Sequence, residues 1–309
     1  MTETIGVAGA AAIGDHIFHV DHLPEKGEIV TVTSFDGALV PGGCAPNIAV
    51  GIAALGRAGA KLYYPVGEDF DASGLLERWS ACGVDCAGLT RVHGVPSGRA
   101  WMYMQEDGTT MCFALPGAAA VARPDGDAVL PDWVVVAPVL NEYTKTILDS
   151  AVRQRRRVVV TGIGSGALEP WLEALTALVV NRREAETLCR DLGAAGCAAL
   201  SRRCPGLLVY VTDGGRGSAL YENGGETRVP PVRCDRLTDF TGAGDAFTAG
   251  VVSALASGMA PDRAAWYGAA AASFVIERLG GQCGMPDWAA LERRLRDQFP
   301  GGLNEKDGK

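Results

Sequence analysis

A run of small and acidic residues in the last third of the chain combines a candidate anion site with a candidate base. The run Asp239-Phe240-Thr241-Gly242-Ala243-Gly244-Asp245 precedes an amphipathic stretch over residues 246–256. Glycines at the start of a helix let backbone N–H groups point to one spot at the positive end of the helix dipole, where anions bind. The Asp245 carboxylate beside it could accept a proton from an alcohol while the amides stabilise charge on a phosphoryl group. The same residues could instead form a tight turn in which Asp245 caps the helix.

A second candidate site lies near the N-terminus, where the sequence reads Gly42-Gly43-Cys44-Ala45-Pro46-Asn47. Two glycines before a helix leave room for a ligand against the backbone, and Pro46 suits the first helical turn. Asn47 offers both a donor and an acceptor to hydroxyl groups. The alternative is a plain turn at the start of a helix, and Cys44 is expected to pack rather than react.

Together these two motifs resemble the paired signatures of the PfkB, or ribokinase-like, carbohydrate kinase family. Two further segments follow in the order of that family. Asn181-Arg182-Arg183-Glu184, after a predicted strand, resembles its Asn-x-x-Glu element near magnesium and phosphate, and residues 211–217 resemble its nucleotide-contact loop. Asp15, after the first strand, matches the acid that holds substrate hydroxyls in relatives. The resemblance spans residues 5 to about 290 and implies a ribokinase-like fold.

The resemblance implies an ATP-dependent kinase that transfers the γ-phosphate, in line, to a primary hydroxyl of a sugar or of the ribose of a nucleoside. Asp245 would be the general base, and the amides of the Gly-Ala-Gly run would stabilise the phosphoryl charge, namely those of Gly242, Ala243 and Gly244. The acceptor would be held by Asp15, Gly42, Gly43 and Asn47. ATP would be held by Thr212, Gly214, Gly217 and Asn181. Asn181 and Glu184 would position Mg²⁺, largely through water, because Mg²⁺ sheds its waters reluctantly.

The resemblance leaves the acceptor and one cation open. The segments 115–118 (Leu-Pro-Gly-Ala) and 276–282 resemble nucleoside and adenosine kinases of the family, which favours a nucleoside over a free sugar. The family's Asp-Thr-Thr is Asp239-Phe240-Thr241 here, so Phe240 replaces a hydroxyl where a monovalent cation could bind near Asp239. Relatives often pair through a lid, which implies a homodimer by analogy.

Two other functions compete with this interpretation. A non-catalytic nucleotide- or metabolite-binding protein could keep the fold, although Asp245 and the glycines of a kinase are present. Residues 162–167 (Gly-Ile-Gly-Ser-Gly-Ala) fit a dinucleotide fingerprint after a strand. However, that fold needs an acid about 20 residues later, at the end of a second strand, and Asn181-Arg182-Arg183 stands there instead.

The composition is that of a globular protein. The 309 residues are 48% hydrophobic and 21% charged, which excludes a disordered chain. The net charge of −8 argues against nucleic-acid binding. Nine cysteines without a Cys-x-x-Cys spacing indicate reduced thiols in the cytoplasm, and no apolar stretch is long enough to predict a membrane span.

Short apolar runs alternate with longer amphipathic stretches, which predicts one α/β domain over residues 1–309 with a mostly parallel sheet covered on both faces. Strands are expected over residues 5–10, 61–66, 133–137, 157–160, 178–180 and 207–212. Helices are expected over residues 46–55, 74–82, 142–154, 183–191, 244–276 with a gap at 258–261, and 287–298. In a lid region of about residues 16–40 and 92–116, two segments break this rhythm: alternating strand residues over 29–40 around Asp36-Gly37, and a hairpin over 99–115 with Glu106-Asp107-Gly108 as its turn. We expect them to pair into a small β-sheet lid, and the polar tail from 301 to fray.

Overall fold

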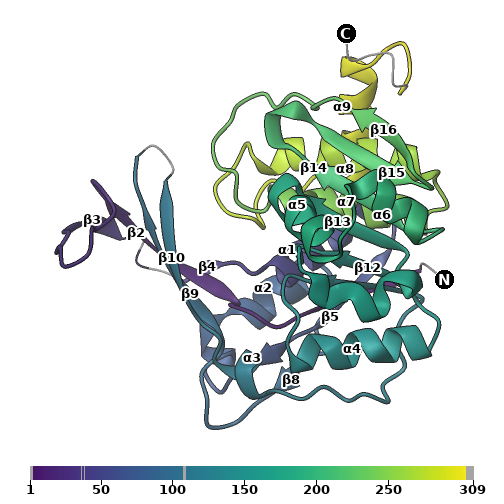
Figure 1. Cartoon of the computed structure of the whole chain (residues 1–309). Helices are drawn as coiled ribbons and strands as arrows, with labels where there is room; N and C mark the ends of the chain where they lie inside the picture. Colours follow the sequence, from purple (N-terminus) through teal and green to yellow (C-terminus); the bar gives the residue numbers. More distant parts are fainter. Residues whose placement is uncertain (1–2, 36, 38, 107–108, 304–309) are drawn as a thin grey trace.

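The computed structural model describes residues 3–35, 37, 39–106 and 109–303, which form an α/β body with a smaller sheet standing off one side (Figure 1). The described strands of the body make a nine-stranded sheet. From edge to edge these are β16 (Gly225–Val229), β15 (Ser218–Glu222), β14 (Leu208–Thr212), β13 (Ala177–Asn181), β12 (Arg157–Thr161), β11 (Trp133–Ala137), β1 (Thr4–Gly9), β5 (Gly59–Tyr63) and β7 (Val84–Asp85). The strands from β14 to β7 are parallel, while β15 and β16 form an antiparallel hairpin at one edge.

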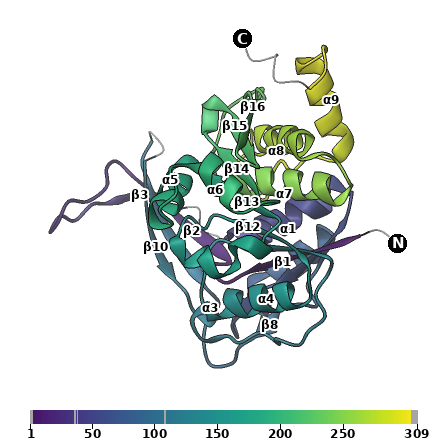
Figure 2. The same cartoon turned by 45° about the vertical axis from the view of Figure 1, so that its right-hand side comes forward.

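Helices cover both faces of this sheet, as the continuous apolar strands predicted (Figure 2). One face packs against α1 (Cys44–Leu55), α2 (Leu75–Ala81), α7 (Ala243–Ala256), α8 (Pro261–Val275) and α9 (Trp288–Gln298). The other packs against α3 (Ala118–Val121), α4 (Glu142–Arg153), α5 (Arg182–Asp191), α6 (Cys197–Arg203) and the 3₁₀-helix η2 (Gly166–Ala174). Alternate residues of β11 serve the two layers, because Val135 lies in the first core and Val134 and Val136 lie in the second.

Local sequence explains where the helices that matter for the site begin and end. α1 ends at Gly56, which has a φ of 67° in the left-handed region that favours glycine. α5 begins at Asn181 with a capping box. α7 and α8 lie unusually close, since a Cβ on Gly250 would stand 2.6 Å from the Tyr267 carbonyl oxygen. The missing side chain of Gly250 thus lets the middle of α7 pack closely against α8.

The smaller sheet, which we call the lid, consists of β10 (Thr110–Leu115), β9 (Arg99–Met104), β2 (Gly14–Val20) and β3 (Val32–Phe35) in that order, with β4 (Val40–Pro41) paired to the start of β2. β2 pairs in parallel with β9, and β9 and β10 form the predicted hairpin. The two segments expected to pair therefore lie in one sheet, with β2 between them. Asp107 and Gly108 of the predicted turn lie outside the described residues, as do Asp36 and residues 304–309 of the tail.

The two faces of the lid differ in chemistry. Cross-strand partners share a face, so Asp15, Ile17, Met102 and Cys112 lie together on one side. The other side carries an aromatic row in which Phe18 stacks on Phe35 and on Tyr103, with ring centroids 4.6 and 5.2 Å apart. This aromatic row continues to Phe113, and Phe35 and Phe113 are 45% and 58% exposed.

Some elements differ from the expectation. The strand predicted over 61–66 is interrupted at Tyr64 and continues as β6 (Pro65–Val66), which pairs with β8 (Thr90–Arg91). The β15–β16 hairpin and α6 were not predicted. In the segment that fits a dinucleotide fingerprint, a Cβ on Gly164 would lie 2.4 Å from the Glu184 Cα atom, so this glycine serves packing against α5. In the described part of the chain, every helix falls short of the length and apolar character that crossing a membrane requires.

Candidate active site

The residues predicted to cradle an anion, which we call the cradle, lie at the start of α7. Gly242 caps the helix with a φ of 79°, and a Cβ there would lie 2.5 Å from the Gly281 Cα atom, so glycine is required. The Ala243 amide donates to the Phe240 carbonyl at 3.2 Å. Among the described residues, the amides of Gly244 and Asp245 have no such partner. Two free N–H groups therefore stand at the positive end of a 14-residue helix.

Asp245 lies in this first turn, and side chains of α1 hold its carboxylate. The Asn47 Nδ2 atom donates to Asp245 Oδ2 at 2.8 Å, and the Cys44 thiol forms a second hydrogen bond to the same carboxylate. Burial raises the pKa of Asp245 to about 6, against the opposing effect of these two hydrogen bonds. Asp245 is therefore ionised at neutral pH yet more basic than an ordinary aspartate. Asn47 is buried, and its Oδ1 atom makes no hydrogen bond within the described residues.

Asp15 comes from the lid and approaches the same place. It is the second residue of β2, and burial raises its pKa to about 6. A Cβ on Gly42 would lie 2.4 Å from Asp15 Oδ2, and one on Gly43 would lie 2.3 Å from the Ala12 carbonyl oxygen. The sequence suggested that these glycines make room for a ligand; in the structure, Asp15 and the chain leading into β2 fill that room. The glycines thus let the lid strand lie directly against the start of α1.

The Cys44 thiol lies within electrostatic reach of three acidic groups. Its pKa is raised well above the ordinary value, first by burial and then by the negative charges of Asp245, Glu184 and Asp15. These groups belong to α7, α5 and β2. Sequence motifs singled out each carboxylate separately, but none predicted their shared effect on this thiol.

A cavity of about 440 Å³ leads from the cradle along the nucleotide-contact loop. Its lining includes the predicted Thr212, Gly214 and Gly217, together with Ala243 and Gly244 of α7. The rest is mainly apolar and was not predicted, with Pro231, Val232, Leu237, Phe240, Phe247 and Ile276 as its larger members. Leu237 and Phe240 are 53% and 70% exposed, and such exposure of large apolar side chains marks a binding surface.

An ion-pair cluster fixes the nucleotide-contact loop. Asp213 accepts hydrogen bonds from Arg216 Nε at 2.8 Å and from Arg216 Nη2 at 2.7 Å, and it also pairs with Arg182. These guanidinium groups hold the pKa of Asp213 well below its usual range. Gly217, at the end of the loop, has a φ of 86°, and a Cβ there would lie 2.2 Å from the Val229 carbonyl oxygen. Because Arg182 follows Asn181 directly, the cluster ties the loop to the start of α5.

The profile of the family described as "pfkB family carbohydrate kinase" matches residues 8–288. The chain belongs to this family. This confirms the family, the ribokinase-like fold and the kinase activity on a sugar or nucleoside that the four motifs implied.

Three relatives illustrate the match. A nucleoside kinase of Methanocaldococcus jannaschii is 28% identical over 95% of this chain and 97% of its own, and its crystal structure superposes with a TM-score of 0.84 at 27% identity, covering 96% and 98% of the two chains. The structure of a Thermotoga maritima ribokinase superposes with a TM-score of 0.80 at 26% identity, covering 95% of this chain and 99% of its own. An Arabidopsis thaliana ribokinase, complexed with ribose and ATP, shares the fold with a TM-score of 0.80 at 22% identity over 96% and 99%.

The residues that the PfkB resemblance assigns to Mg²⁺ are partly committed to helix capping. Asn181 Oδ1 accepts from the Glu184 amide, and Glu184 Oε2 accepts from the Asn181 amide, both at 2.9 Å. Glu184 Oε1 remains as a hard oxygen ligand, which is the type Mg²⁺ prefers. The described residues contain no group of three or more His, Cys, Asp or Glu side chains that could hold a metal. Asn181 and Glu184 therefore fit a Mg²⁺ ion whose remaining ligands are water and substrate phosphate oxygens.

Asp239, near which the PfkB resemblance suggested a monovalent cation, holds three hydrogen bonds within the protein. Its Oδ1 atom accepts from the Thr241 amide at 2.9 Å and from the Thr241 hydroxyl at 2.8 Å. Its Oδ2 atom accepts from the Gly280 amide at 2.9 Å. The carboxylate thereby ties the cradle to the loop after α8. Sequence analysis singled out Asp239 but not these partners.

Proposed function

We propose that the protein transfers the γ-phosphoryl group of ATP to a primary hydroxyl on a sugar ring, with Asp245 as general base. The observation that carries this proposal is the place of Asp245 in the first turn of α7, where Asn47 holds its carboxylate and the preceding Ala243 and Gly244 line the cavity that reaches Thr212. An acceptor held by Asp15 and Asn47 would give its hydroxyl proton to Asp245. Its oxygen would then bond to the γ-phosphorus as the bond to the ADP oxygen breaks in line.

The phosphoryl charge that develops would be stabilised by the free amides at Gly244 and Asp245 and by the α7 dipole. The predicted Ala243 amide already donates to Phe240, so we assign the cradle to the next two N–H groups of the turn. Mg²⁺, held by Asn181 and Glu184, would neutralise charge on the ATP phosphates. Thr212, Gly214 and Gly217 would contact the nucleotide.

We infer that the acceptor is a nucleoside. The lid face that carries Asp15 continues with Ile17, Met102 and Cys112, which offer an apolar surface to a nucleobase beyond the ribose. The M. jannaschii relative is named a nucleoside kinase, which agrees with this choice. A free pentose, as the ribokinase relatives suggest, would leave that apolar surface unused.

We also propose that two copies pair through the aromatic row of the lid. Phe35 and Phe113 expose large apolar area on a single-layer sheet, and a second copy would cover it. Replacing Phe113 by Glu should yield monomers in sedimentation velocity, and a wild type that sediments as a monomer would exclude this pairing.

We also propose a cytoplasmic location, because the nine free cysteines suit a reducing compartment.

The activity is tested by ADP release with nucleosides, pentoses and hexoses, each with and without EDTA and with K⁺ or Na⁺ as the monovalent cation. Turnover of nucleosides that needs Mg²⁺ and disappears in Asp245→Asn is the expected result. Preference for a free pentose would overturn the nucleoside assignment but keep the kinase. If Asp245→Asn retains wild-type turnover, Asp245 is not the base.

A further inference from the structure

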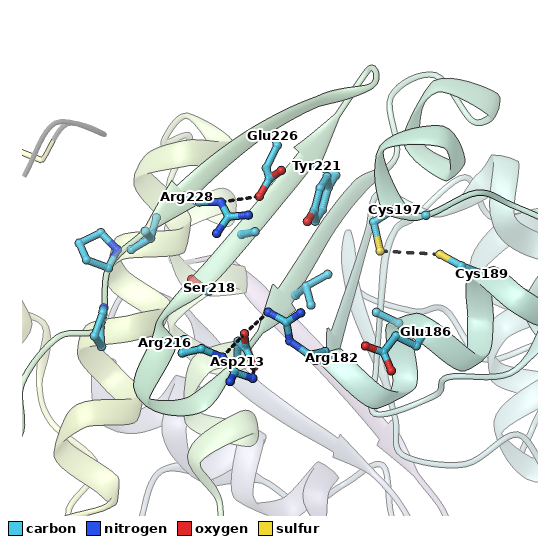
Figure 3. A pocket seen from close by; sticks show the side chains of 17 residues that line it. Arg182, Glu186, Cys189, Cys197, Asp213, Arg216, Ser218, Tyr221, Glu226 and Arg228 are labelled. Atoms are coloured by element: carbon cyan, nitrogen blue, oxygen red, sulfur yellow. Dashed lines mark hydrogen bonds and ion pairs between the residues drawn. The ribbon is translucent and has the colours of Figure 1, made fainter. Parts of the chain in front are cut away.

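A second cavity, of about 510 Å³, lies between α5, the start of α6 and the β15–β16 hairpin (Figure 3). Arg182, Asp213 and Arg216 stand at one side of it, and two thiols, of Cys189 and Cys197, stand at the other (Figure 3). Neither cysteine takes part in the proposed phosphoryl transfer. The cavity gives a small reagent a route from solvent to both sulfur atoms.

The two thiols already touch. Cys189 lies in the last turns of α5 and Cys197 is the first residue of α6, and their Sγ atoms are 3.8 Å apart. A disulfide has an S–S length of about 2.05 Å, so roughly 1.8 Å of approach is needed. The connection between the helices contains Gly193 and Gly196, where a Cβ would meet no atom within 4 Å. Backbone adjustment there and rotation of the Cys197 side chain can supply this approach.

Burial keeps both thiols protonated at neutral pH. It is the largest cause that raises the pKa of Cys189, and together with the neighbouring thiol it raises the pKa of Cys197 to about 12. The thiolate is the species that attacks a disulfide, so these raised pKa values make thiol–disulfide exchange slow at neutral pH. Among the described residues, the exposed Cys82 and Cys112, in contrast, make no such contact with a second thiol.

We propose that Cys189 and Cys197 form a modification site that reacts with a low-molecular-weight disulfide such as oxidised glutathione. One thiolate attacks a sulfur of the reagent, which breaks the S–S bond, forms a mixed disulfide and releases one glutathione thiolate. The second cysteine then loses its proton, and its thiolate attacks the sulfur of the first cysteine in this mixed disulfide. The bond to the glutathione sulfur breaks, and the second glutathione leaves as a thiolate. The two protein thiols are oxidised, the reagent is reduced to two thiols, and α5 becomes covalently joined to α6.

The sequence provides a direct readout. Trypsin cleaves after Arg183, Arg190 and Arg202, so Cys189 lies in peptide 184–190 and Cys197 in peptide 191–202. After incubation of the full chain with oxidised glutathione, we expect these two peptides as one cross-linked species that dithiothreitol separates. Cys82 and Cys112 should carry glutathione adducts instead.

Matched variants separate this outcome from general oxidation. Cys197→Ser should abolish the cross-link and leave a glutathione adduct or a free thiol on Cys189, while Cys82→Ser should cross-link as the wild type does. Kinase turnover of each variant before oxidation reports that it is folded. Recovery of peptides 184–190 and 191–202 as separate adducts from the wild type, or cross-linking of either to another cysteine peptide, would overturn the proposal.

Discussion

Replacement of Asp245 by Asn should remove activity and at the same time stabilise the fold. The carboxylate is held in a site that raises its pKa from 3.8 to about 6, which means that the folded protein disfavours its charge. A shift of about two pKa units corresponds to roughly 3 kcal/mol of differential free energy. The neutral Asn avoids this cost, and its amide oxygen can still accept from Asn47 Nδ2.

The gain in stability depends on pH in a defined direction. Between about pH 4 and pH 6 the folded protein retains a proton that the unfolded chain has released, so the free energy of unfolding of the wild type falls as the pH rises. Asp245→Asn lacks this dependence. We therefore expect the variant to be more stable by about 1–3 kcal/mol near pH 8 and equal to the wild type near pH 4.

Urea unfolding followed by fluorescence at several pH values measures the difference, and steady-state assays should show turnover lowered by about 10²–10⁴-fold. Asp239→Asn is the matched control. Its carboxylate accepts three hydrogen bonds, so the same change there should destabilise the protein at neutral pH. A stability of Asp245→Asn equal to that of the wild type at pH 8, or a difference that persists unchanged at pH 4, would refute the reasoning.

Three further predictions concern the acceptor and the nucleotide. The value of kcat/KM should fall as the pH drops through about 6, by about tenfold per pH unit for each carboxylate that must be ionised, and Asp15→Asn should make the remaining decline shallower; a flat profile down to pH 5 would contradict this. Gly42→Ala places a methyl group 2.4 Å from Asp15 Oδ2, so the KM for the acceptor should rise about tenfold or more while the KM for ATP stays near its wild-type value. Gly217→Ala forces a φ of 86° on alanine and a contact of 2.2 Å with the Val229 carbonyl oxygen, which should raise the KM for ATP selectively; equal effects on both substrates would argue against a nucleotide role of the loop.

The fold and the approximate location of the candidate site could be predicted from the sequence, because the information is local. Apolar runs predict the parallel strands, and glycines with an adjacent acid predict a candidate anion site at the start of a helix. Asn181 and Thr212 are the last residues of the neighbouring strands β13 and β14, and their pairing places both motifs at the same end of the sheet.

What could not be predicted depends on contacts between distant segments. The occupation of the Gly42 space by Asp15 requires the lid strand to lie against α1, which no local pattern encodes. The apolar lining by Leu237 and Phe240 is visible only once their exposure is known. The edge hairpin was missed because its strands lack a continuous apolar run, since one face of β16 is open to solvent.

The connection between β1 and β2 sets how far each part of the lid can travel. The buried Tyr64 hydroxyl accepts from the Ala11 amide at 2.9 Å and donates to the Ala12 carbonyl at 3.0 Å, which anchors the root of the lid to the body. At about 3.3 Å per residue of β2, Val20 lies roughly 17 Å farther along the strand than Asp15. Any swing about this root therefore carries the tip much farther than Asp15. In the proposed kinase, the tip would travel widely while the acid near the root stays close to the acceptor.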